Sequence, residues 1–201
     1  MQELFFQHAW IGIPVWVLLY ISDYTLTLIC ARMYQNGVRD KIAFEGSYEL
    51  TPYFQRDIDS LRIISPKFVA ALVTTSILLI ILWWLAQLFT PSLFLFALGA
   101  VISSQLCIHI RHIRNFFLFK AASTEAVRGR IEYSRPLSLR ASSVEMLSFA
   151  GLFLILYIFT GSWFILGGVM SLLSIAAKHS KLARTYVSPE KPKQVAASGI
   201  G

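Results

Sequence analysis

The fold is decided by the stretch from His109 to Arg140, HIRHIRNFFLFKAASTEAVRGRIEYSRPLSLR, in which basic and polar residues interrupt an otherwise apolar second half of the chain. An apolar region lies on each side of it. Each region contains a short bend, at Thr90-Pro91-Ser92 before the stretch and at Thr160-Gly161-Ser162 after it. Helices of about 20 apolar residues cross a lipid bilayer, so each region is predicted to be a pair of membrane-spanning helices. The polar stretch would then join the two helical hairpins on one side of the membrane.

The composition also favours a protein whose solvent is lipid. Apolar residues make up 56% of the 201 positions and charged residues only 14%, whereas soluble domains carry about 25% charged residues. The ranges Phe68–Phe89 and Met146–Ala177 contain no charged residue at all. As one helix the second range would be about 48 Å long, well beyond a hydrocarbon core of about 30 Å. We therefore expect it to bend at Gly161.

The position of the basic residues predicts the number of spans and their orientation. All 18 Lys and Arg fall into three segments, with six in 32–67, seven in 111–140 and five in 178–193. Five spans would bring the three segments to one face, and the positive-inside rule then places the amino terminus outside and the carboxyl terminus in the cytoplasm. We expect an all-α, polytopic transmembrane bundle in a prokaryotic cytoplasmic (inner) membrane, with one amino-terminal span followed by the two hairpins.

The expected single transmembrane domain covers residues 1–186, and a tail at 187–201, rich in Pro, Ser, Ala and Gly, is predicted to be disordered in the cytoplasm. The predicted spans are 9–31, 67–89, 92–115, 143–159 and 162–177, and the cytoplasmic segments between them are 32–66 and 116–142.

Local signals mark several helix boundaries. Ser65-Pro66 and Thr90-Pro91 each place a capping residue before a proline, which favours the start of a helix. Ser142-Ser143-Val144-Glu145 has the capping-box pattern, so we expect the fourth span to begin there. Thr51-Pro52 is predicted to start an amphipathic helix that runs to about Ile64 and lies on the membrane surface or against the bundle.

One acidic residue, Asp23, falls inside the expected first span, and Thr27 lies on the same helical face. An ionisable side chain at this depth is costly against lipid, so it should face the bundle interior. In the third span, Gln105 and His109 lie at a similar depth. We expect Asp23, Thr27, Gln105 and His109 to form an intramembrane polar cluster that makes a proton-linked or solute-contact site. The alternative is that Asp23 only makes structural hydrogen bonds.

A second group, Arg111, His112, Arg114 and Arg140, is predicted to contact phosphate or anionic lipid, because arginine binds phosphate bidentately and a row of cations attracts acidic lipids of the inner leaflet. The alternative is an ordinary positively charged flank of a span. Nucleic-acid binding is not expected, because the membrane topology already accounts for the basic residues.

His109, His112 and His179 are candidates for metal or haem ligation, but Arg111 and Arg114 beside them would repel a cation, so we expect no cofactor. The sequence contains no zinc motif, phosphate-binding loop, nucleophile elbow or dinucleotide fingerprint.

Small residues four positions apart predict close helix packing. Gly99 with Ser103 and Gly167 with Ser171 form two such pairs, and similar sequences surround them. They could belong to a parallel repeat of the two hairpins, although apolar sequences also match by chance.

The leading hypothesis is a non-enzymatic permeation or transport unit that works as a homo-oligomer or as a subunit of a larger membrane complex. One alternative is a membrane-embedded enzyme that acts on a lipid head group at the cytoplasmic surface, in a pocket that opens sideways to the inner leaflet. Another is an assembly scaffold. The expected partners are anionic inner-leaflet lipids and a second copy or another membrane protein.

Overall fold

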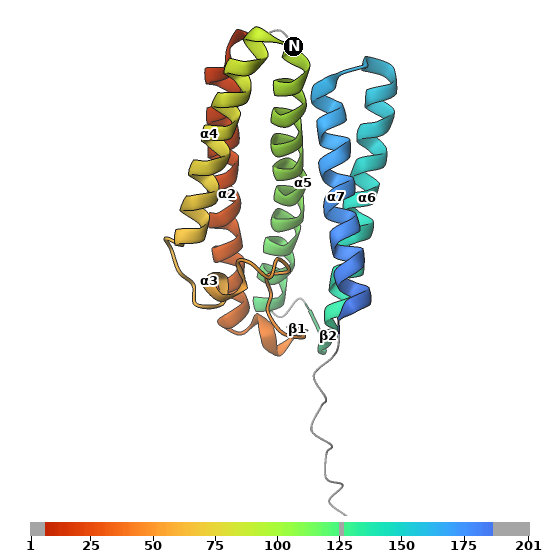
Figure 1. Ribbon diagram of the computed structural model, residues 1–201. Coiled ribbons are helices and arrows are strands. Elements are labelled where there is room, and N and C mark those ends of the chain that lie inside the picture. Colours follow the sequence, from red (N-terminus) through yellow and green to blue (C-terminus); the bar gives the residue numbers. More distant parts are fainter. Residues whose placement is uncertain (1–6, 125–126, 187–201) are drawn as a thin grey trace, which may run out of the picture.

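The computed structural model describes residues 7–124 and 127–186, so the predicted disordered tail at 187–201 lies outside the described residues. The described chain is mostly helical. Five of its helices are long and apolar enough to cross a membrane, which confirms the predicted helical class and fits an integral membrane protein. These helices, shown in Figure 1, are α2 (Ala9–Gln35), α4 (Pro66–Leu88), α5 (Pro91–Ser123), α6 (Arg135–Thr160) and α7 (Trp163–Thr185).

The two ends of the bundle differ. At the end that we call the hairpin end, short bends join α4 to α5 and α6 to α7 (Figure 1). The opposite end, the loop end, carries residues 36–65 and 127–134. The shorter elements of the loop end are η1 (Val38–Asp40), β1 (Ile42–Phe44), α3 (Gln55–Asp59) and β2 (Ile131–Tyr133).

Three predicted helix boundaries are confirmed by their caps. The hydroxyl of Ser65 accepts a hydrogen bond from the backbone N–H of Phe68 at the start of α4, and Thr90 caps α5 in the same manner. α5 then continues without a break to Ser123, past the basic residues that follow the apolar run. Gly161, at φ 59°, ends α6, so the predicted bend at this glycine is also confirmed.

Two predicted boundaries are wrong. α6 begins at Arg135, well before the expected start near Ser142. Ser134 caps it and a proline follows in the first turn, which is the stronger local signal. The hydroxyl of Ser142 instead contacts neighbouring helices, as described below.

The expected surface helix is much shorter than predicted, because α3 ends at Asp59. Leu61 has a positive φ of 49°, and the N–H of Arg62 donates to the carbonyl of Asp57 at 2.9 Å. A left-handed residue with this bond closes a helix at its carboxyl end.

α5 is the central helix: it packs against α2, α4 and α7, whereas α6 packs mainly against α7. Toward the hairpin end, α2, α4 and α5 enclose an apolar core that includes Trp16, Leu79, Phe94 and Leu98. A second apolar core fills the loop end; it includes Cys30, Tyr34, Val38, Ile58 and Phe119. These two cores fix α5 against α2 on either side of the candidate site.

Glycines set the contact between α5 and α7. A Cβ atom added to Gly99 would lie 1.9 Å from the backbone oxygen of Phe164, and one added to Gly167 would lie 1.9 Å from that of Phe96. Ser103 lies against Gly168, and the Ser171 hydroxyl donates to the Ala100 carbonyl at 2.9 Å. The contact is therefore reciprocal: Gly99 of α5 and Gly167 of α7 occupy matching positions in similar sequences, and each lies against the backbone of the other helix. This reciprocity agrees with the proposed repeat of the two hairpins, which itself stays a prediction.

A two-stranded parallel sheet links the two halves of the loop end. Ile42 pairs with Ile131 and Phe44 with Tyr133, whose rings stack at 5.4 Å. The sheet holds the segment after β1 close to the start of α6.

Candidate functional site

Two adjacent cavities meet at one turn of α5, near the loop end. The larger, which we call the Arg114 cavity, has a volume of about 280 Å³ and lies between α5, α6 and the segment after β1. The smaller, the Asp23 cavity, has a volume of about 160 Å³ and lies between α2, α4, α5 and residues 49–58. Glu49, Arg111 and His112 line both cavities.

The depth of this turn can be estimated from helix geometry. α5 rises about 30 Å from Pro91 to Arg111 at 1.5 Å per residue, which matches the thickness of a hydrocarbon core. The two cavities therefore lie where the apolar part of a bilayer would give way to its head groups.

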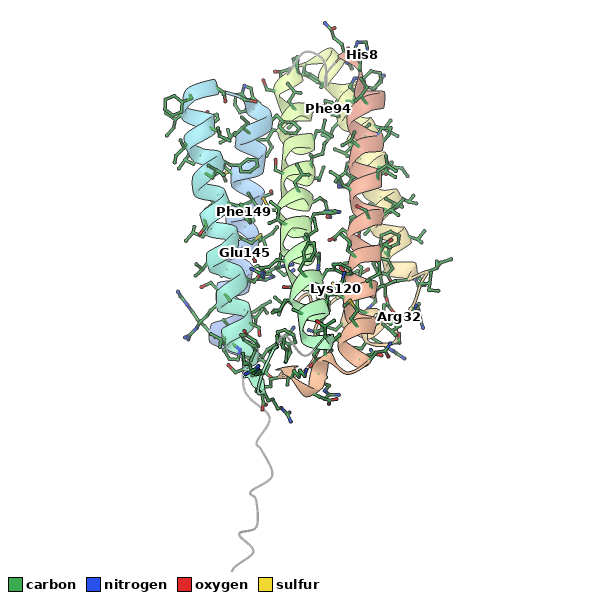
Figure 2. All side chains as sticks on the ribbon, turned by 180° about the vertical axis from the view of Figure 1, so that it is seen from behind. His8, Arg32, Phe94, Lys120, Glu145 and Phe149 are labelled. Carbon is green, nitrogen blue, oxygen red and sulfur yellow. The ribbon has the colours of Figure 1, made fainter. Side chains whose placement is uncertain are left out.

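Side chains of α5 and α6 meet around the Arg114 cavity. The guanidinium of Arg111 donates to the Ser142 hydroxyl at 2.7 Å, and the same hydroxyl is 2.9 Å from Nδ1 of His179 on α7. Arg114 forms an ion pair with Glu145 at 2.8 Å. Figure 2 shows Glu145 on α6, beside α5. Arg111 differs from Arg114 because it makes no ion pair with a carboxylate anywhere in residues 7–124 and 127–186.

Arg135 positions the loop that covers this cavity. Its buried guanidinium donates to the carbonyl oxygens of Ser47, Glu49 and Leu50, at 2.8, 3.0 and 2.9 Å. Its backbone N–H donates to the Glu45 carboxylate at 3.0 Å. Four contacts from one residue hold a loop that has no regular structure of its own.

The loop delivers Tyr48 to the cavity wall, where the amide of Asn115 donates to its phenol oxygen at 3.3 Å. Burial raises the pKa of the Tyr48 phenol well above its ordinary value. Tyr48 is therefore a neutral hydroxyl at physiological pH and can itself donate a hydrogen bond.

The Asp23 cavity contains an acid and a histidine in contact. Nε2 of His112 lies 3.2 Å from Oδ1 of Asp23 and 3.2 Å from Oγ1 of Thr27. The Asp23–His112 contact is close enough for an ion pair, but it does not have the geometry of a directed hydrogen bond. Gln105 lines the same cavity and is only 9% exposed, and its amide oxygen has no hydrogen-bond partner among the described residues.

The structure brings together three of the four residues of the predicted polar cluster. Asp23, Thr27 and Gln105 all line the Asp23 cavity. His109 does not line it: its Nε2 is 2.6 Å from the Ser22 hydroxyl, and its Nδ1 bonds the Gln105 carbonyl at 2.7 Å. His112, which we had grouped with the arginines, takes the place beside Asp23.

The predicted anion-contact group is divided as well. Arg111 and Arg114 line the Arg114 cavity, whereas Arg140 is exposed on α6 and lines neither cavity. The small-residue pairs that predicted helix association form a contact within one chain, between α5 and α7.

The three candidate metal-binding histidines have separate partners, namely Ser22, Asp23 with Thr27, and Ser142. Within the described ranges, no three His, Cys, Asp or Glu side chains come together to hold a metal ion.

Sequence reasoning missed Tyr48, Glu49, Arg135 and Ser142. A signal existed for Ser142, because the spacing that suggested a capping box also puts it on the same helical face as Glu145. The loop residues carried no comparable signal, since their place depends on the contacts of Arg135.

Comparison of the sequence with protein-family models and with curated proteins, and of the structure with solved structures, finds no match.

Proposed function

We propose that this integral membrane protein binds the phosphate-bearing head group of a membrane lipid in the Arg114 cavity. The observation that carries the proposal is the state of Arg111. Its half-buried guanidinium is held by one hydroxyl, that of Ser142, and by no carboxylate of the described residues. A guanidinium has five N–H donors in a rigid fork, so Arg111 retains donors for an anion, and phosphate accepts two of them side by side.

The place of the cavity favours a lipid as the source of the phosphate. Arg111 is about 30 Å along α5 from the hairpin end, at the depth of head groups. The cavity lies between α5 and α6, whose side chains meet there while α6 packs mainly against α7. The cavity residues Leu118 and Ala141 are exposed, which suits an acyl chain leaving the cavity toward the bilayer.

We further propose that the loop end faces the cytoplasm. The Lys and Arg residues that the structure describes lie in helix ends and loops of that end (Figure 1). Such an excess of Lys and Arg marks cytoplasmic segments, and the negative potential of the inner leaflet would draw anionic lipids to it.

Binding is better supported than permeation through one copy of the chain. The apolar core around Trp16, Phe94 and Leu98 fills the half of the bundle toward the hairpin end. The backbone contact at Gly99 and Gly167 closes α5 against α7 in the same half. Both features separate the polar cavities from the opposite face of the membrane.

A reaction on the head group has less support. His112 is the only histidine that lines the Arg114 cavity among the described residues, and its Nε2 already contacts Asp23 and Thr27. We therefore propose binding without chemistry.

The test is a lipid-binding measurement on the purified protein in detergent, by native mass spectrometry. The probes are phosphatidic acid, phosphatidylglycerol, diacylglycerol and inorganic phosphate. Arg111→Gln should weaken binding of the two phospholipids about tenfold, the effect of one charged hydrogen-bonding group. Diacylglycerol, which has no phosphate, should bind both proteins equally, and inorganic phosphate should bind far more weakly than the phospholipids.

Arg140→Gln is the matched control, because it removes the same charge from a residue that lines neither cavity. Equal losses in the two variants would mean that only general surface charge attracts lipid, and the proposal would be wrong. Appearance of cleaved or transferred lipid during the incubation would replace binding by catalysis.

A further inference from the structure

We infer that the bound head group carries a primary ammonium next to its phosphate, as phosphoethanolamine does, and that the Asp23 cavity receives the ammonium. This inference rests on phosphate binding beside Arg111 and adds the chemical class of the lipid. It starts from the composition of the smaller cavity, which differs from that of its neighbour.

The Asp23 cavity is rich in hydrogen-bond acceptors. Asp23, Glu49 and Gln105 all line it. One oxygen of the Glu49 carboxylate accepts a hydrogen bond from the backbone N–H of Thr51 at 2.6 Å, and the other is left for a ligand. The amide oxygen of Gln105 is buried and has no donor within the described parts of the chain. Oδ1 of Asp23 is buried as well and accepts no directed hydrogen bond, although it lies 3.2 Å from Nε2 of His112. A buried acceptor without a donor costs about 1–3 kcal/mol. A primary ammonium offers three N–H donors and a positive charge, and so satisfies these groups together.

Aromatic rings complete the wall of this cavity. Tyr20 and Tyr24 both stack on Phe68, with ring centroids 5.0 and 4.3 Å apart, and all three residues line the cavity. Because these rings stack on one another, and Tyr20 stacks on Trp16 as well, neighbouring rings cover much of their faces, and they provide an apolar wall that limits the access of water to the acceptors. The hydroxyl of Tyr24 already donates to the carbonyl of Arg62 at 2.7 Å, so Tyr24 contributes its ring.

The two cavities are adjacent, as the two charged groups of such a head group require. They share the lining residues Glu49, Arg111 and His112, so a ligand that lies against Arg111 in one is next to the other. Phosphoethanolamine separates its phosphate and its ammonium by two methylene groups. The guanidinium of Arg111 would face the phosphate, and the carboxylates of Asp23 and Glu49 would face the ammonium.

The same chemistry disfavours choline and glycerol head groups. Choline has a positive charge but no N–H donor, so it would leave the buried acceptors of this cavity without hydrogen bonds. Glycerol has hydroxyl donors but no charge to balance two carboxylates. We therefore expect phosphatidylethanolamine to bind about tenfold more tightly than phosphatidylcholine or phosphatidylglycerol with the same acyl chains.

The experiment compares these three lipids on the wild type and on two variants by native mass spectrometry. Asp23→Asn should reduce the preference for phosphatidylethanolamine over phosphatidylglycerol to less than about threefold, and should leave phosphatidylglycerol binding unchanged. Glu49→Gln lies outside the spanning helices and should act in the same direction, so the inference stays testable if the Asp23 variant does not fold. Soluble phosphoethanolamine, added as a competitor, should displace the lipid only at much higher concentration.

The outcomes separate this inference from the proposed function. If Arg111→Gln weakens all three lipids but the wild type binds them equally, the phosphate site stands and the ammonium site is overturned. If both acid variants keep the full preference, the ammonium site is again overturned. If the acid variants lose the preference while Arg111→Gln changes nothing, the ammonium site stands and phosphate binding by Arg111 is wrong.

Discussion

Arg135 organises more of the candidate site than any residue that the sequence singled out. Its guanidinium donates to three backbone carbonyl oxygens of the loop from Ser47 to Leu50. This loop supplies Tyr48 and Glu49 to the cavities. A side chain that fills its donors with backbone carbonyls defines one loop conformation and leaves the others with buried, unpaired groups.

Arg135→Ala should therefore lower the free energy of unfolding by about 2–4 kcal/mol, because several charged hydrogen bonds from a buried residue are lost. Thermal unfolding in detergent, followed by tryptophan fluorescence, measures this change. Arg140→Ala, an exposed arginine on the same helix, should leave the midpoint within experimental error. Similar midpoints for the two variants would show that the loop is held by other contacts.

At the residue scale, the sequence could predict helical faces but not partners. The spacing of Asp23 and Thr27 puts them on one face of any helix, and the structure brings both to His112. The choice of His112 over His109 depends on how far α2 is rotated and shifted against α5. Packing at Gly12, which lies against Leu98, contributes to that shift, and no spacing within one helix encodes it.

At the scale of single helices, the contact between α5 and α7 shows how small residues allow close packing of two helices. Two glycines allow the helix backbones to touch, and the hydroxyl of Ser171 bonds a carbonyl of the facing helix. Their small residues are thus used within one chain. The homo-oligomer that we expected from the same residues needs another surface, and it stays a prediction.

Gly167→Ala should destabilise the protein by about 1–3 kcal/mol, because its methyl group would overlap the carbonyl of Phe96 and force the helices apart. Gly151→Ala is the control: a methyl group there meets nothing within 4 Å, so the midpoint should be unchanged or slightly higher. Both are read from thermal unfolding in the same detergent. A Gly167 variant as stable as the control would contradict the close contact.

Helix starts could be predicted where the capping residue acts locally. Ser65 and Thr90 bond N–H groups of their own first turns, so the sequence alone identifies them. Ser142 has the right neighbours for a cap, but its hydroxyl binds Arg111 and lies beside His179, on two other helices. Local sequence cannot distinguish these two uses of a serine.

At the scale of the whole molecule, the described residues form a bundle of five helices able to span a membrane and a folded loop end with an apolar core of its own. Hydropathy and charge are sums over long stretches, so the number of helices able to span a membrane followed from the sequence. The loop-end core was not predicted. It joins residues from α2, α3, α5 and the segment between α2 and β1, which are far apart in the chain.

The proposed orientation can be tested with single cysteines. Phe89→Cys, at the hairpin end, should react with a membrane-impermeant maleimide in intact cells, whereas Arg39→Cys, at the loop end, should react only after the membrane is opened. Both positions are exposed, and the native Cys30 and Cys107 are buried. The reverse labelling pattern would place the loop end outside the cell.

The central place of α5 has a consequence for the order in which the protein matures during synthesis. Chains fold from the amino terminus as they leave the ribosome. The residues that line the Asp23 cavity all lie between Tyr20 and His112, so most of its wall can form when three spans are in place, and the loop that supplies Glu49 is fixed once Arg135 follows. The Arg114 cavity also needs Ser138, Ser142 and Glu145 of α6. Until the last hairpin inserts, Arg111 has no Ser142 to hold it, and the glycine face of α5 remains uncovered. The nascent chain would thus present an incomplete binding site. A lipid bound to this site could guide the final hairpin into position.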